Sequence, residues 1–405
     1  MTRIVLSGGR VFDGTGAPLA EADVVIEDGR FVAVGSGLDG DESVDVRGKA
    51  LLPGLFDCHT HVMVSAMNVF ELVQQPFSYQ FFVAAQNLAR TLDVGITSVR
   101  DAGGADLGVK EAVATGLIRG PRLSISVTAL SQTGGHVDDW QPSGARLPLM
   151  VGHPGRPAGV VDGPEEIRRK VRELVRAGAD VIKVCTSGGV LSARDDPRHA
   201  HFRPDELDVL VAEAAAAGLW VMAHAQATDG IKNAVRAGIR SIEHGIFLDD
   251  EAIGLMLERG TWLVPTLVAP QAVLDAVAAG VPVPAASARK AADVIDIHRD
   301  SFARAVDAGV RIAMGTDSGV SPHGNNLHEL ALMVAGGMTA TDALVATTSS
   351  AAELLGVADE LGTIEPGKRA DLVVVDGDPL DVGSLAGNVA AVYQDGRLVS
   401  RGLSG

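Results

Sequence analysis

The sequence contains almost no cysteine: Cys58 and Cys185 are the only two among 405 residues. Each lies in an apolar, strand-like run, so the two cannot supply the disulfide framework of a small secreted protein. The first residues also lack the pattern of a signal peptide. We therefore expect a reducing compartment and predict a cytoplasmic protein.

Long apolar runs and clusters of basic residues are missing as well. No apolar stretch approaches the roughly 20 residues that cross a bilayer, so we predict no contact with a membrane. The formal net charge is −17 and no group of Lys and Arg stands out, which argues against nucleic acid as a partner. The chain is 46% hydrophobic and long enough for one large domain and a smaller one.

The two ends of the chain share one pattern. Residues 1–50 and 360–405 have the composition of short strands separated by tight turns, such as Asp13-Gly14 and Asp395-Gly396. We predict that both segments pair into one small β-sandwich that is discontinuous in sequence. Residues 51–359 would then form the larger domain.

Residues 51–359 alternate short apolar strands with longer helical stretches, a pattern typical of βα units and a parallel sheet. The eight candidate strands are 50–57, 97–101, 122–128, 180–185, 220–224, 241–244, 261–265 and 311–316, and helices are expected at 165–177, 204–217 and 340–355. The predicted fold class is therefore α/β, a (β/α)8 TIM barrel. The long intervals 129–164 and 266–300 are candidate substrate loops.

Residues that bind metals or carry protons stand where several of these strands finish. Side chains that alternate along a strand share a face, so the imidazoles of His59 and His61 point the same way. The other such residues are Lys183 inside the fourth strand, His224 and His244 at the ends of the fifth and sixth, and Asp317 after the eighth. In a parallel barrel the carboxyl ends of the strands meet at one mouth, where active sites lie.

Taken singly, each of these residues has an ordinary explanation. A histidine at a strand end is often a hydrogen-bonded structural residue, and Asp317 after Gly-Thr could be a helix N-cap. Lys183 is harder to explain, because a buried ammonium must be paired, have a lowered pKa or be chemically modified. Together, four histidines, a lysine and an aspartate at one mouth predict a metal site.

These motifs, with the closing segment 361–372, resemble the amidohydrolase superfamily, specifically its two-metal branch with a carboxylated lysine on the fourth strand. The resemblance implies that His59 and His61 bind the more buried metal, carboxylated Lys183 bridges both metals, His224 and His244 bind the second, and Asp317 contacts the buried one. It also implies that Asp317 is the general acid/base when a metal-bridged hydroxide attacks a carbonyl. Zinc is the metal expected at both positions, although manganese or cobalt would also suit these ligands.

Three segments make the chain most similar to the Xaa-Pro and Xaa-Arg/Lys dipeptidases, carboxypeptidase-like enzymes and ochratoxin-hydrolysing members of the superfamily. They are residues 133–136, 183–192 and 242–245. The resemblance implies that His136 is catalytic and donates to the oxyanion that develops on the scissile carbonyl. One departure is Gln226, which stands where many relatives carry a second histidine.

We therefore predict hydrolysis of a small-molecule amide, a dipeptide or an N-acyl amino acid. Arg194 or Arg198 could pair with the substrate carboxylate, and Gln226 would lie in the substrate site. The alternative is an aryl-amide, phenylurea or carbamate hydrolase, which the neutral Gln226 would favour. A single-metal deaminase is less favoured, because Lys183 is present and no glutamate follows His224 closely.

A non-catalytic protein of the same fold would be expected to have lost metal ligands, whereas all six are present here. We expect a homo-oligomer. The remaining histidines receive no role: His153, His199, His201 and His298 are expected on loops or helix surfaces, and His323 and His328 follow Asp317 too loosely to assign.

Overall fold

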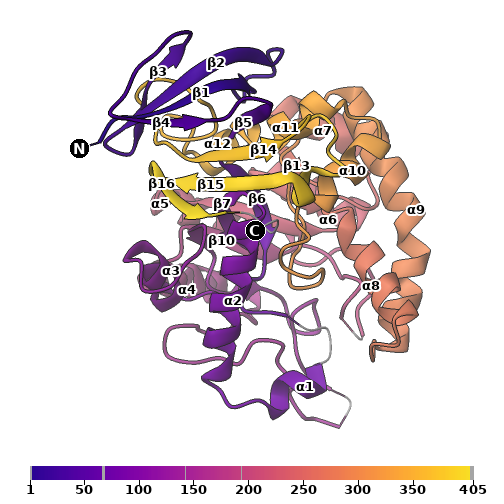
Figure 1. Cartoon of the computed structure of the whole chain (residues 1–405). Helices are drawn as coiled ribbons and strands as arrows, with labels where there is room; N and C mark the ends of the chain where they lie inside the picture. Colours follow the sequence, from indigo (N-terminus) through magenta and orange to yellow (C-terminus); the bar gives the residue numbers. More distant parts are fainter. Residues whose placement is uncertain (1, 66–68, 142, 193, 402–405) are drawn as a thin grey trace.

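The computed structural model describes residues 2–65, 69–141, 143–192 and 194–401. Its strands form three sheets, one built from the two ends of the chain and two from the middle (Figure 1). The α/β class with parallel sheets is confirmed. No helix within the described ranges is long and apolar enough to cross a membrane.

The terminal sheet joins the first and last parts of the chain. Its strands are β1 (Ile4–Val11), β2 (Ala20–Glu27), β3 (Arg30–Gly35), β4 (Glu42–Asp45), β5 (Lys49–Pro53), β14 (Leu372–Asp376), β15 (Val389–Gln394) and β16 (Arg397–Ser400). They lie in the order β16-β15-β14-β5-β1-β2-β3, with β4 beside β1. The antiparallel pair of β14 and β5, with Val373 opposite Leu52, links the two chain ends.

The middle of the chain supplies two parallel sheets, with the orders β6-β7-β8 and β13-β12-β11-β10-β9. Their strands are β6 (Leu55–Thr60), β7 (Ile96–Asp101), β8 (Arg122–Ile125), β9 (Ala129–Leu130), β10 (Val181–Cys185), β11 (Trp220–Ala225), β12 (Ser241–His244) and β13 (Trp262–Val264). Parallel strands need crossover connections, and helices supply most of them here.

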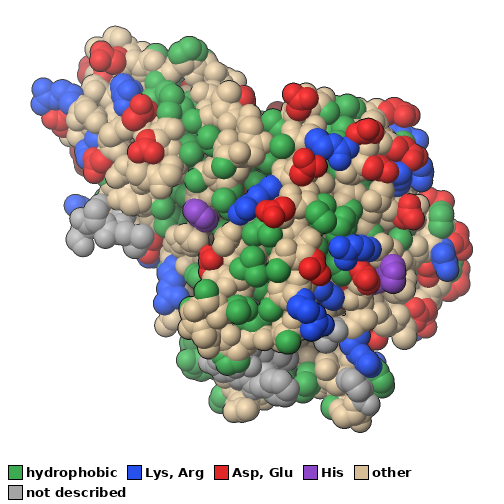
Figure 2. All heavy atoms as spheres, turned by 90° about the vertical axis from the view of Figure 1, so that its right-hand side faces the viewer, with side chains coloured by type: hydrophobic (Ala, Val, Ile, Leu, Met, Phe, Trp, Pro, Cys, Tyr) green, Lys and Arg blue, Asp and Glu red, His purple; other side chains and the backbone are tan. Residues whose placement is uncertain are grey.

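The helices lie around the parallel sheets, and α9 forms the right-hand edge of Figure 1. They are α1 (Val69–Gln74), α2 (Tyr79–Asp93), α3 (Leu107–Ala114), α4 (Gly163–Arg176), α5 (Pro204–Ala216), α6 (Thr228–Ala237), α7 (Asp250–Arg259), α8 (Val268–Ala278), α9 (Ala285–Ala308), α10 (His328–Ala335), α11 (Ala340–Ala346) and α12 (Ser349–Leu355), with a 3-10 turn at Leu385–Asn388. On the face that Figure 2 shows, acidic and basic side chains are interspersed.

Helix α4 shows how the sequence pattern sets the packing. Ile167, Val171 and Leu174 recur at helical spacing, so one face of α4 is buried while its charged face stays in water. These residues belong to the same apolar core as Ile182 and Val184 of β10. Burial of these apolar side chains stabilises the position of β10 against α4, and Lys183 lies on β10.

Two predicted strands are interrupted in the structure. The predicted strand 50–57 becomes β5 in the terminal sheet and β6 in a parallel sheet, with Gly54 between them. The Gly54 N–H donates to Asp371 O at 2.8 Å, and a Cβ on Gly54 would lie 2.2 Å from Thr97 Oγ1, so only glycine fits this close approach. The predicted strand 122–128 is regular only to Ile125, where β8 ends; Val127 follows with a φ of +65°, and β9 begins beyond the predicted strand, at Ala129.

The predicted eighth strand, 311–316, is wrong as a regular strand. It makes isolated parallel bridges instead, from Ile312 to Leu263 of β13 and, just beyond it, from Ser318 to Thr60 of β6. The segment therefore lies between β13 and β6 and carries Asp317 to the edge where those strands end. The predicted helix 340–355 is also divided, into α11 and α12, where Thr347 Oγ1 donates to Phe56 O at 2.7 Å.

Candidate metal centre and active site

A cavity of about 660 Å³ opens at the carboxyl ends of the parallel strands. Nine residues predicted for the site line it: His59, His61, His136, Lys183, Arg194, His224, Gln226, His244 and Asp317. Arg198, the other candidate for the substrate carboxylate, is not among the lining residues, and its guanidinium lies 5.0 Å from the centre of the Phe247 ring. The structure thus brings the predicted ligands together from five separate segments of the chain.

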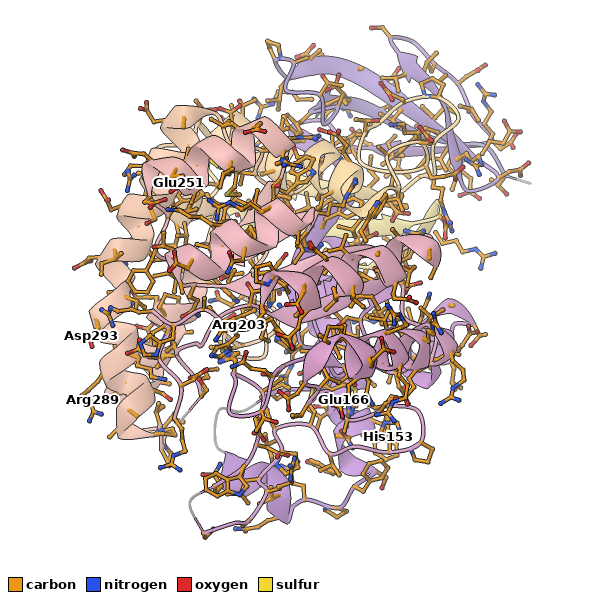
Figure 3. All side chains as sticks on the ribbon, turned by 180° about the vertical axis from the view of Figure 1, so that it is seen from behind. His153, Glu166, Arg203, Glu251, Arg289 and Asp293 are labelled. Atoms are coloured by element: carbon orange, nitrogen blue, oxygen red, sulfur yellow. The ribbon has the colours of Figure 1, made fainter. Side chains whose placement is uncertain are left out.

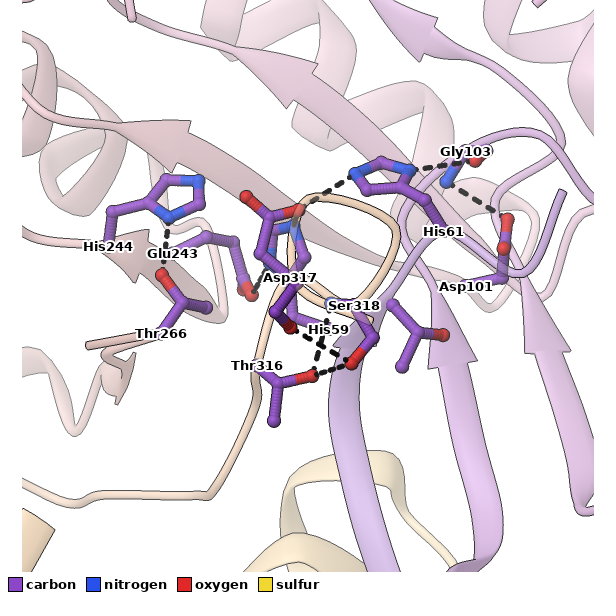
Figure 4. Close-up of polar contacts among 12 residues, drawn as sticks. His59, His61, Asp101, Gly103, Glu243, His244, Thr266, Thr316, Asp317 and Ser318 are labelled. Carbon is purple, nitrogen blue, oxygen red and sulfur yellow. Dashed lines mark hydrogen bonds and ion pairs between the residues drawn. The ribbon is translucent and has the colours of Figure 1, made fainter. Parts of the chain in front are cut away.

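His59, His61, His244 and Asp317 form one group of neighbouring side chains in this cavity (Figure 4). Ligand atoms of His59, His244 and Asp317 all lie within 4.8 Å of one another. Asp317 Oδ1 is 3.3 Å from His61 Nε2 and 3.5 Å from His59 Nε2. This buried oxygen has no hydrogen bond of normal geometry to any described residue.

A row of imidazole rings continues from this group toward the cavity wall. The ring centres of His59 and His244 are 5.0 Å apart, and those of His244 and His224 are 4.6 Å apart. His136 then stacks on His224, with 4.1 Å between centres and an interplanar angle of 16°. His136, predicted as a catalytic residue, therefore lies beside the predicted ligands.

The backbone is strained where it aims these side chains. His244, Thr266 and Asp317 have φ values of +72°, +55° and +57°, in the left-handed region that residues other than glycine rarely adopt. His244 Nδ1 lies 2.7 Å from Thr266 Oγ1, which fixes the orientation of the ring. Strained residues of this kind cluster at functional sites.

Burial sets the charge state of the group. It lowers the pKa of His59, His224 and His244 well below the ordinary value, so these rings are neutral at pH 7 and keep a free lone pair. Burial also lowers the pKa of the Lys183 ammonium. Burial of His61 is outweighed by the Asp317 carboxylate beside it, which raises the pKa of that ring instead. Three neutral imidazoles and a carboxylate oxygen without a hydrogen bond are donors of the kind that a divalent metal takes, so the residues fit one.

Glu243 and Arg100 form a layer behind the ligands that the sequence analysis missed. Glu243 is fully buried, and its Oε2 lies 2.7 Å from His59 Nδ1. Its Oε1 accepts from Arg100 Nη2 at 2.9 Å and from Ser241 Oγ at 2.5 Å. A carboxylate on that ring nitrogen leaves Nε2 for a ligand. The signal was available, because Glu243, like Lys183, is a charged residue inside an apolar strand.

His136 has its own partners, which were also missed. Its Nδ1 lies 2.9 Å from Ser192 Oγ and 3.4 Å from Asp195 Oδ2. Arg194 is exposed at the mouth of the cavity, with its guanidinium 5.6 Å from the centre of the Trp140 ring. Gln226 is buried, and its Oε1 has no hydrogen-bond partner among the described residues.

His201 lies on a loop as expected, but the expectation that His298 lies on a loop or a helix surface is wrong. Both are buried, with exposed fractions of 6% and 1%. His298 lines the cavity from α9, and its Nε2 lies 2.9 Å from His244 O. His298 therefore supports the strained backbone at His244. Its position could not be foreseen, because only the packing of α9 brings it there.

The model of the amidohydrolase family matches residues 50–399. The chain belongs to the amidohydrolase family. This confirms the resemblance drawn from the sequence and supports a hydrolase that acts on amide bonds of small molecules. The match covers both parallel sheets and the last strands of the terminal sheet.

Among family members, ochratoxinase from Aspergillus niger is 36% identical over 400 residues, which cover 93% of this chain and 82% of that protein. The crystal structure of a Xaa-Pro dipeptidase with bound methionine has a TM-score of 0.88 at 35% identity and covers 98% of this chain and 99% of that one. The structure of a prolidase complexed with N-methylphosphonate-L-proline has a TM-score of 0.90 at 39% identity and covers 99% and 100%.

Proposed function

We propose that this amidohydrolase cleaves the amide bond of a dipeptide or an N-acyl amino acid with the help of two divalent metal ions. The observation that carries the proposal is the convergence of six predicted ligands and His136 on one cavity. The similarity to ochratoxinase and to the two peptidase structures supports the same class of reaction.

Both metals, zinc in the first instance, would be held by His59, His61, carboxylated Lys183, His224, His244 and Asp317. Carboxylation fits Lys183, because a lowered pKa favours the neutral amine that reacts with carbon dioxide and because the product is an anionic oxygen donor. When bound, such cations supply Lewis acidity and lower the pKa of water to about 7.

The chain's own residues would bind the substrate and move the proton. Asp317, whose Oδ1 lies 3.3 Å from His61 Nε2, would accept the proton of the attacking water and return it to the leaving nitrogen. His136 would donate from Nε2 to the carbonyl oxygen with both ring nitrogens protonated, since Ser192 Oγ and the Asp195 carboxylate take up its Nδ1–H. The products would be a carboxylic acid and an amine.

The outer part of the cavity would hold the rest of the substrate. Arg194 at the mouth is the cation proposed to pair with a substrate carboxylate, and Gln226 Oε1 is a free acceptor for a substrate N–H. The neutral Gln226 also supports the second candidate, hydrolysis of an aryl amide, phenylurea or carbamate, because an uncharged substrate needs no cation beside it.

A hydrolysis screen tests both candidates. Purified, zinc-loaded protein would be offered Xaa-Pro and other dipeptides, N-acyl amino acids, anilides and phenylureas side by side. We expect the highest kcat/KM for a dipeptide or an N-acyl amino acid. Faster hydrolysis of an anilide or a phenylurea than of every peptide would establish the second candidate, and no hydrolysis of any of them would refute both.

We also propose that the parallel sheets close into the predicted (β/α)8 barrel over residues 51–359 and that the terminal strands form the predicted sandwich. The bridges of 311–318 to β13 and β6 support closure on one side. The hydrogen bond from Asp180 N to Ile125 O, 2.8 Å long, supports it on the other. A homo-oligomer in the cytoplasm remains the prediction from the sequence, which light scattering and cell fractionation would test.

A further inference from the structure

Against His136 lies a small group of loop residues, Gly189, Ser192 and Asp195, which we name the His136 cradle. Gly189 provides the space for the ring: a Cβ on Gly189 would lie 2.2 Å from His136 Cε1 and 2.5 Å from its Nδ1. Ser192 and Asp195 face Nδ1 of the same ring. Gly189 therefore packs closely against the imidazole ring, and Ser192 and Asp195 lie at its Nδ1 edge.

Asp195 is the centre of the cradle's polar contacts. Its side chain is only 2% exposed, and its Oδ2 accepts from Gly189 N at 3.1 Å. Ser192 Oγ donates to Asp195 Oδ1. Burial raises the pKa of Asp195, but the hydrogen bonds and charges of His136, Ser192 and Lys290 outweigh burial and bring that pKa to about 2. Asp195 is therefore a carboxylate at neutral pH.

Lys290 fastens the cradle from helix α9. Its ammonium donates to Gly189 O at 2.9 Å, to Ser192 O at 2.8 Å and to Asp195 Oδ1 at 3.2 Å. All three donors of the ammonium are thus used on one loop. The neighbouring Arg289 points outward from α9 instead (Figure 3) and is exposed.

We propose that Lys290 is a positioning residue for His136: by clamping the cradle, it holds the His136 ring at the orientation that the reaction uses. This inference rests on the proposed function. It assigns a role to the interval 266–300, because Lys290 of that interval lies 2.8–3.2 Å from three oxygens of the loop that carries Gly189, Ser192 and Asp195. Among the described residues, the hydrogen bonds of the Lys290 ammonium include none to a proposed metal ligand.

Kinetics of Lys290→Met test the proposal, with Arg289→Met as the matched control on the same helix. A single oxyanion donor contributes about 100- to 1,000-fold to kcat, so a misplaced His136 should lower kcat by about tenfold or more. KM should change by less than about threefold, because the interaction is made in the transition state. Lys290→Arg, which keeps donors for the two carbonyl oxygens, should recover part of the loss, and Arg289→Met should match the parent.

A double-mutant cycle shows whether Lys290 acts through His136. In a His136→Asn background, Lys290→Met should change kcat by less than about twofold, because the ring that it positions is gone. An equal loss in both backgrounds would overturn the proposal. Gly189→Ala provides a second variant should Lys290→Met fail to fold, since the three atoms nearest to its Cβ all belong to the His136 ring. Gly254→Ala, with open space around the Cβ, is its control.

A readout without substrate separates this inference from the proposed function. Hydrogen exchange by mass spectrometry should show faster exchange of residues 188–192 in Lys290→Met than in Arg289→Met, and a crystal structure of Lys290→Met should show a rotated or displaced His136 ring. If no amide is hydrolysed but these changes appear, the proposed function fails and the clamp stands. If exchange and the ring are unchanged, the clamp fails whatever the enzyme hydrolyses.

Discussion

The inner and outer walls of the cavity are built differently. The inner wall consists of side chains on strands, such as Lys183, His224 and His244, whose heights follow from strand pairing: Cys185 lies opposite His224, and Ala225 opposite His244. The outer wall consists of loop residues such as Trp140 and Arg194, which are exposed and contact each other across distant segments. The pairing of parallel strands fixes where the side chain of a metal ligand can lie, whereas a loop can place a side chain in many positions.

This contrast separates chemistry from recognition. Residues of the inner wall are buried and supported from behind, so they suit metal ligation and proton transfer. Residues of the outer wall lie on loops and are exposed to solvent, so they suit selection among substrates. We therefore expect the effects of substitutions to decrease from the inner wall to the outer one.

Lys183→Ala should have the largest effect. It removes the only proposed bridging ligand, so the protein should lose most of its metal and its activity, with partial rescue by formate or acetate. Metal analysis of the purified parent should give two metals per chain, because six ligands exceed what one tetrahedral ion takes. Lys170→Ala on α4 is the control. Near-normal metal content in Lys183→Ala, or one metal per fully active parent chain, would contradict the two-metal site.

Asp317→Asn should slow turnover by about 100-fold or more while the protein stays folded, because an amide cannot accept the proton. The comparison is kcat with the best substrate, alongside circular dichroism and metal content. Turnover at the parental rate would remove Asp317 from the proton path and leave it a ligand at most.

The inner wall could be predicted from sequence because strand periodicity and residue chemistry both point to it. His59 and His61 share a face by alternation alone, and Lys183 stands out because an apolar strand offers it no partner. The layer behind was not predicted: Arg100 reaches Glu243 only through the three-dimensional arrangement of β7 and β12. Nor could His298 be placed, since nothing local marks the face of α9 that turns inward.

The fold shows the same division. Apolar periodicity predicted β7, β10, β11 and β12 to within a residue or so. It failed at Gly54, where a run that is continuous in hydrophobicity changes sheets because of a backbone contact with Asp371. It also failed at 311–316, which has the composition of a strand but makes isolated bridges instead of a regular ladder.

Glu243→Gln should have an intermediate effect. A weaker acceptor behind His59 should reduce metal affinity by about 10- to 100-fold, measured by competition with a chelator. The buried Arg100 would also lose its counter-charge, so the melting temperature should fall. Glu251→Gln on the surface of α7 is the matched control. An unchanged affinity in Glu243→Gln would show that Glu243 only neutralises Arg100.

Arg194→Met should have the smallest effect and the most selective one. An exposed ion pair is worth about 0.2–1 kcal/mol, so KM for a substrate with a carboxylate should rise by only about 1.4- to fivefold, with kcat preserved. KM for a neutral anilide should not rise. Arg198→Met is the matched control, because Arg198 does not line the cavity. An equal rise for charged and neutral substrates would mean that Arg194 shapes the mouth through Trp140 and does not select for charge, and the case for an uncharged aryl or urea substrate would then be the stronger one.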